Sequence, residues 1–171
     1  MATFDVNGDL DHIQEAVLLP NDDYAVIITK DPVREPNAVM RDEGAAADKA
    51  GYNIILRTRV YDPEVPEAHG RMFTIYLPLP NDTDEGKYTP QGQGAKDSKL
   101  DRIKNAAAAF SGDGSGSTVN FEVGMMAVAK VIQKQDRNDA SKKVNEINTF
   151  AGLLSTRVLD RSQSWMRFRR E

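Results

Sequence analysis

The chain has 171 residues, 40% hydrophobic and 28% charged, which suits one folded domain with extensions and excludes wholesale disorder. It contains no cysteine, which excludes disulfides, thiolate metal sites and cysteine nucleophiles. The net charge of −4 is unevenly distributed: residues 1–50 carry eleven acidic and four basic side chains, so residues 51–171 carry a net charge of +3.

No apolar run approaches the roughly 20 residues of a membrane helix. The acidic N-terminus also lacks the basic and apolar regions of a signal peptide. We therefore expect a soluble protein of the reducing cytoplasm, without a membrane partner.

The N-terminal third is expected to hold one strand between two irregular stretches. Residues 1–20 are interpreted as an arm, either a helical turn or an extended segment, and Asn21-Asp22-Asp23 has the side chains of a turn. Residues 24–30 are rich in β-branched side chains and predict a strand. Residues 31–50 then form a loop longer than most connections, and such loops tend to be functional or mobile.

The most informative stretch is residues 51–62, which alternates two kinds of side chain with a period of two. Successive side chains of a strand point to opposite faces, so this pattern predicts a long central strand. One face holds core-forming side chains (Tyr52, Ile54, Leu56, Thr58, Val60), and the other is cationic and aromatic (Asn53, Ile55, Arg57, Arg59, Tyr61). The second face suits single-stranded nucleic acid. A solvated strand face is the alternative, since arginine is mostly exposed in any case.

Residues 71–80 predict the next strand, with Phe73, Ile75, Leu77 and Leu79 on the core face. Met72, Thr74 and Tyr76 would then continue the cationic face of the central strand. The prolines at positions 78 and 80 indicate that this strand ends or leaves the sheet there.

One helix is expected in the second half. Ser98 and Asp101 resemble a capping box, which predicts a helix beginning at Ser98. Apolar residues at helical spacing follow, and Gly112 predicts the end of the helix.

Two further strands should form a hairpin after the helix. Gly124 predicts a bend before a strand at residues 125–134, and residues 142–150 predict the last strand. In the closing segment, aromatic residues alternate with arginines.

The order of these elements predicts a mainly β protein: a five-stranded, OB-fold-like Greek-key barrel with one helix between strands 3 and 4. We expect an N-terminal arm at residues 1–20, the barrel at residues 21–150 and a basic aromatic extension at residues 151–171.

Several stretches also carry a family resemblance, namely Leu19-Pro20, residues 24–28, residues 51–60, Gly70-Arg71 and residues 144–150. Together they resemble small bacteriophage single-stranded-DNA-binding proteins of the OB-fold type, over roughly residues 18–150. The resemblance implies a protein of phage DNA replication or recombination in the host-cell cytoplasm. Many such proteins end in an acidic tail that recruits partners, whereas this chain ends with five arginines against two acids after residue 150.

The expected partner is therefore single-stranded DNA. The predicted nucleic-acid-binding residues are the exposed cations and aromatics of the strands: Arg57, Arg59, Tyr61, Arg71, Tyr76, Lys130 and Lys134. The predicted protein-binding residues lie in the extension, where phage replication or recombination proteins or a second copy of the chain would dock: Trp165, Arg167, Phe168, Arg169 and Arg170.

Nothing in the chain predicts an enzyme, a cofactor or a metal site. His12 and His69 each lack a second ligand at metal-binding spacing, and no nucleophile elbow surrounds any serine. The alternative to DNA binding is a protein-interaction module on the same barrel. A barrel that binds a small ligand or nucleotide is a third interpretation.

Overall fold

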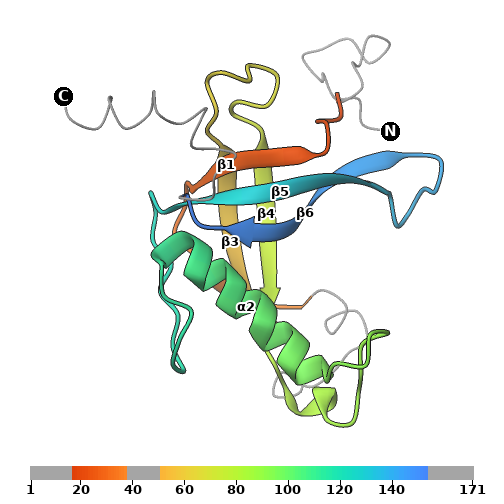
Figure 1. Cartoon of the computed structure of the whole chain (residues 1–171). Helices are drawn as coiled ribbons and strands as arrows, with labels where there is room; N and C mark the ends of the chain where they lie inside the picture. Colours follow the sequence, from red (N-terminus) through yellow and green to blue (C-terminus); the bar gives the residue numbers. More distant parts are fainter. Residues whose placement is uncertain (1–16, 38–50, 154–171) are drawn as a thin grey trace, which may run out of the picture.

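The computed structural model describes residues 17–37 and 51–153. These residues form an antiparallel sheet of six strands with one long helix (Figure 1). The elements in chain order are β1 (Asp22–Ile28), β2 (Val33–Pro36), β3 (Tyr52–Val60), β4 (Met72–Pro78), the short 3-10 helix η2 (Asp82–Asp84), α2 (Ala95–Ser111), β5 (Met126–Gln135) and β6 (Lys143–Ala151).

Strand β3 is the centre of the sheet because it pairs with three other strands. Its first half pairs with β2 and its second half with β1 along one edge, and β4 runs along the other edge. On the far side of β1 follow β5 and then β6. The sheet thus has β4 at one end and β6 at the other, and α2 packs against both of these strands (Figure 1).

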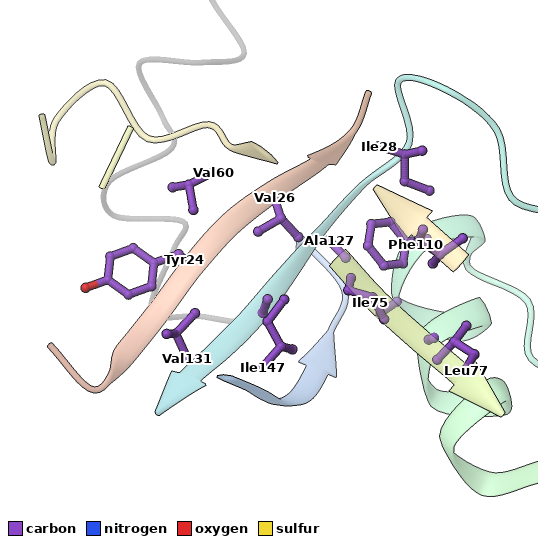
Figure 2. Close-up of a cluster of buried hydrophobic side chains, with 14 of the residues drawn as sticks. Tyr24, Val26, Ile28, Val60, Ile75, Leu77, Phe110, Ala127, Val131 and Ile147 are labelled. Carbon is purple, nitrogen blue, oxygen red and sulfur yellow. The ribbon is translucent and has the colours of Figure 1, made fainter. Parts of the chain in front are cut away.

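The hydrophobic core lies between one face of the sheet and α2. Leu56 and Val60 from β3, Ile75 from β4 and Phe110 from α2 contribute to one continuous cluster. Figure 2 shows side chains from β1, β4, β5, β6 and α2 gathered in it. Full burial of each such side chain is worth about 1.5–3 kcal/mol. A strand that was turned over would lose this free energy, so burial in the core determines which side of each strand faces inward.

The core confirms the predicted faces of β3 and β4. Leu56, Thr58 and Val60 are fully or almost fully buried, and Ile54 packs on the cluster. In β4, Ile75 and Leu77 are buried and Phe73 packs on the core. The alternate residues of both strands therefore point away from the core.

The prediction of a mainly β fold is confirmed, but five strands is not the number found, since β2 adds a sixth. Consequently α2 lies between β4 and β5. Pro32, directly before β2, and Pro36, its last residue, favoured a loop. This short segment nevertheless pairs with the first half of β3 as an edge strand, a position that tolerates proline.

The predicted start of the helix is also wrong, by about one turn. The helix begins at Ala95, and its N-cap, Gly94, makes no side-chain capping bond. Ser98 lies inside the first turn, where its backbone N–H donates to the Gly94 carbonyl. The predicted end is confirmed, because Gly112 adopts a left-handed conformation, with φ of 80°, and donates its N–H to Ala108.

Candidate nucleic-acid interface

The outward residues of β3 and β4 form one continuous surface. In the antiparallel register, Arg59 lies opposite Met72, Arg57 opposite Thr74 and Ile55 opposite Tyr76. Tyr61 follows directly after β3 with the same orientation. We call the surface made by Arg57, Arg59, Tyr61, Met72, Thr74 and Tyr76 the outer ridge. Five of these six residues are exposed, and Arg57 is half-buried.

The outer ridge exposes an unusual amount of large apolar and aromatic surface. Met72 is 71% exposed, Tyr76 54% and Tyr61 41%. The Tyr61 ring stands edge-on to His69, with 5.4 Å between the ring centroids. Grouped exposed side chains of this kind are more informative about binding than a single exposed leucine or valine.

The two arginines of the outer ridge differ in how far their charge is already compensated. Arg57 Nη2 lies 3.9 Å from Glu35 Oε1 of β2, and the two side chains are 40% and 48% exposed. Such a contact is worth only about 0–1 kcal/mol. The Arg59 side chain has neither a hydrogen bond nor an ion pair with any other residue in the described ranges. The Arg59 guanidinium is therefore the cation of the ridge that is most available to an anion.

The outer ridge does not extend onto β1 and β5. Next to it, Ala25 and Val128 are only 2% exposed and form a small apolar cluster with Met126 and Ala151. Lys130 lies beyond this cluster, directly opposite Asp23 of β1. The structure thus separates Lys130 from the arginines of β3.

Lys134 and its neighbours in the β5–β6 hairpin are in contact with acids. Lys134 Nζ lies 2.9 Å from Glu146 Oε1, and Lys142 Nζ lies 3.6 Å from Asp139 Oδ2. Hydrogen bonds from the side chain and the backbone N–H of Ser141 lower the pKa of Asp139, which keeps this carboxylate ionised. Lys134 and Lys142 are thus compensated by acids, whereas Arg137 and Lys143 of the same hairpin are exposed and have no ion pair with another described residue.

Arg71 belongs to the opposite side of β4. It shares its orientation with Phe73, and its Nη1 donates a 2.6 Å hydrogen bond to the carbonyl oxygen of Val17. Its guanidinium thus fixes the segment that leads into β1, and the structure does not bring it together with Arg57 and Arg59. The predicted protein-binding residues Trp165, Arg167, Phe168, Arg169 and Arg170 lie outside the described residues.

Two contacts between β2 and β3 were not predicted from the sequence. Arg34 of β2 lies over the Tyr52 ring, 4.2 Å from its centroid, and Glu35 reaches Arg57. Both follow from the pairing of β2 with β3. The alternation of Val33, Arg34 and Glu35 was the only signal in the sequence that could have indicated this strand.

A buried ion pair fixes the segment after β4. Asp84, 7% exposed, accepts hydrogen bonds of 2.7 and 2.8 Å from Lys99 Nζ of α2, and it caps the backbone N–H of Asn81. Desolvation, the largest effect, raises the pKa of Asp84. The hydrogen bonds from Lys99 and Asn81, together with the charges of Lys99 and Lys87, outweigh it and hold the pKa below its ordinary value of 3.8. This pair ties the end of β4 to the helix.

Within residues 17–37 and 51–153, no group of three or more histidine, aspartate or glutamate side chains could hold a metal ion. None of the helices in these ranges is long and apolar enough to span a membrane. No protein-family model matches the chain, and no curated protein is similar to it.

Proposed function

We propose that the protein binds single-stranded DNA on the outer ridge. The observation that carries the proposal is that Arg57 and Arg59 share one solvent-facing surface with Tyr61, Met72 and Tyr76, while the opposite faces of the same strands form the core. Proteins that bind single strands without sequence preference combine these two elements, cations for the backbone and flat side chains for the bases.

Each component of the ridge has a separate physical role. The guanidinium groups of Arg57 and Arg59 suit phosphate because their planar N–H donors match its oxygens. The rings of Tyr61 and Tyr76 offer stacking surfaces, and stacking on an aromatic side chain is worth about 1–3 kcal/mol per base. Met72, between them, adds an adaptable apolar contact.

We further propose that the sheet is an OB-fold with β2 added to its first connection. Without β2, the strands run in the order β4-β3-β1-β5-β6, with the helix after the third strand of the remaining five. This arrangement agrees with a partly open Greek-key barrel, in which the second and third strands, here β3 and β4, lie at the centre of the ligand groove and the first loop and the last hairpin loop flank it. In a phage, such a protein would act in DNA replication or recombination, with the extension at residues 151–171 recruiting partner proteins.

One observation favours a protein partner instead. Met72 is 71% exposed, and Arg57 contacts an acid of its own chain. Exposed methionine beside arginine is also typical of protein interfaces. A protein-interaction module without nucleic-acid binding is therefore the second candidate function.

Salt dependence distinguishes the two candidates. Fluorescence anisotropy of labelled oligo-dT, titrated with the full chain at several salt concentrations, should show saturable binding that weakens with salt. Two phosphate contacts predict a slope of about −1.4 in a plot of log K against log salt concentration. A lack of binding at low salt would contradict the proposal. Salt-resistant co-purification of a protein would then favour the second candidate.

A further inference from the structure

We propose that Arg102 of α2 is a third phosphate-binding arginine, which extends the single-stranded-DNA site from the outer ridge over the edge of β4 onto the helix. The inference rests on the proposed function, because it adds a contact to the same site. It follows from the two contacts that hold the Arg102 guanidinium and from the N–H donors that these contacts leave available.

Arg102 lies between the two end strands of the sheet. Among the described strands, β4 pairs only with β3 and β6 pairs only with β5, and α2 packs against both end strands. Arg102 Nε donates a 3.4 Å hydrogen bond to the carbonyl oxygen of Tyr76 in β4. Its guanidinium carbon lies over the ring of Phe150 in β6, 5.8 Å from the centroid. The guanidinium is therefore held beside Tyr76, at one end of the outer ridge.

These two contacts use few of the donors of Arg102. An arginine side chain has five N–H donors, and the Tyr76 carbonyl accepts only the one on Nε. Contact with an aromatic face leaves the donors in the guanidinium plane accessible. The N–H groups on Nη1 and Nη2 donate to no other residue in the described part of the chain. Two of them are enough for a bidentate contact with a phosphate.

The charge of Arg102 is not compensated by an acid. No acidic side chain forms an ion pair with it in residues 17–37 and 51–153. Asp101, the acid next to it in the sequence, instead accepts a hydrogen bond from Gln93. The residues about one helical turn away are not acidic: Ser98, Lys99, Asn105 and Ala106. Arg102 is also half-buried, so solvent and salt screen its charge less than that of a fully exposed lysine.

Tyr76 and Arg102 together offer one nucleotide two different contacts. The Tyr76 ring is 54% exposed and can stack on a base. The Arg102 guanidinium, at the backbone of the same residue, can bind the phosphate. A side chain that is already held at two points also loses little rotamer freedom when it binds a ligand. The site therefore continues beyond β4 onto α2.

Salt dependence tests the third contact. Labelled oligo-dT is titrated with the full chain by fluorescence anisotropy at several salt concentrations. Three phosphate contacts predict a slope of about −2.1 in a plot of log K against log salt concentration, whereas the two arginines of the ridge alone predict about −1.4. Arg102→Gln should weaken binding about tenfold at low salt and reduce the slope by about 0.7. An unchanged slope in this variant would overturn the inference. Absence of binding by the wild-type chain at low salt would instead mean that the proposed function itself fails.

Lys104→Gln is the matched control. Lys104 is exposed on the same helix, about 200° around the helix axis from Arg102, and the substitution removes the same charge. Its slope should stay at the wild-type value. Equal reductions in the two variants would show that only the net charge matters and would overturn the inference.

A purely structural role of Arg102 gives a different result. Loss of the contacts with Tyr76 and Phe150 alone would lower the melting temperature and leave the salt slope unchanged. Where Arg102→Gln does not fold, NMR of the ¹⁵N-labelled wild-type chain decides. The Nε–H signal of Arg102 should shift when oligo-dT is added, and a signal that stays in place would overturn the inference.

Discussion

The outer ridge and the β5–β6 hairpin both expose basic side chains, but they differ in the acids and the aromatic rings that lie beside these cations. On the ridge, the only ion pair in the described ranges is the 3.9 Å contact between Arg57 and Glu35, and Arg59 has none. On the hairpin, Lys134 and Lys142 each lie beside an acid at 2.9 and 3.6 Å, Arg137 and Lys143 have no ion pair in the described ranges, and no aromatic side chain is exposed. The number of cations on a surface is thus a poor guide to its affinity for phosphate. We expect this affinity to depend on the acids next to the cations and on the aromatic rings of the same surface.

The largest effect is expected from the double substitution Arg57→Ala and Arg59→Ala. Loss of two charge-assisted contacts should weaken oligo-dT binding by about 2–3 kcal/mol at low salt, which is more than tenfold. Anisotropy titrations with the wild-type chain measured in parallel provide the comparison. Since neither side chain belongs to the core, the melting temperature should stay unchanged. Unaltered affinity in this variant would move the site away from the ridge.

Tyr76→Ala should cost about 1–3 kcal/mol of binding energy, because it removes one stacking surface. Its salt slope should match that of the wild type, since no charge changes. This combination separates the contribution of the rings from that of the arginines. A change in slope without a change in affinity would contradict the assigned role of Tyr76.

Asp84→Asn tests whether the end of β4 depends on its ion pair with Lys99. The pKa of Asp84 is lowered in the folded protein, so its contribution to stability is present above about pH 4 and is lost as the pH falls through the lower folded value. The substitution should cost roughly 1–2 kcal/mol of unfolding free energy at pH 7, with Lys99 partly exposed to solvent. It should also reduce the loss of stability below pH 4. Urea titrations at pH 7 and pH 3 measure both effects, and an equal cost at the two pH values would count against the assigned charge interaction.

Glu35→Gln should strengthen binding, because it frees Arg57 from its acidic neighbour. The gain is expected to be small, about 0.2–1 kcal/mol, since the ion pair is exposed. In the Arg57→Ala background the same substitution should give no gain beyond a small long-range effect. An equal gain in both backgrounds would show that Glu35 acts on the strand directly rather than through Arg57.

The smallest effect is expected at the hairpin. Lys134→Ala should change oligo-dT affinity by less than about 0.5 kcal/mol, because this lysine is already paired with Glu146. The measurement is the same anisotropy titration. A loss as large as that of the Arg57 and Arg59 double variant would remove the difference between the two regions.

The sequence was sufficient to predict which face of β3 and β4 is buried. The alternation from Ile54 to Val60 and from Phe73 to Leu77 leaves only one orientation that buries the apolar side chains. The same alternation groups Arg71 with Phe73, so its separation from the ridge could have been predicted. The conformation of Gly112 followed from its position after the last helical turn.

Other features depend on partners that are distant in the sequence. Strand β2 forms only because the first half of β3 offers it an edge, and its two prolines concealed this from a local pattern. The ion pair between Lys134 and Glu146 depends on the register of β5 and β6, which shifts at a bulge between Lys130 and Val131. Helix α2 begins before Ser98 because the Ala95 N–H donates to the Lys87 carbonyl in the preceding loop.

The central claim, that the ridge rather than the hairpin binds the strand, is tested most directly by NMR. Amide chemical shifts of the ¹⁵N-labelled full chain are compared before and after addition of oligo-dT. The account predicts that the largest changes fall on residues 55–61 and 72–76, with small changes at residues 133–144. Changes concentrated at residues 133–144, with β3 and β4 unaffected, would contradict it.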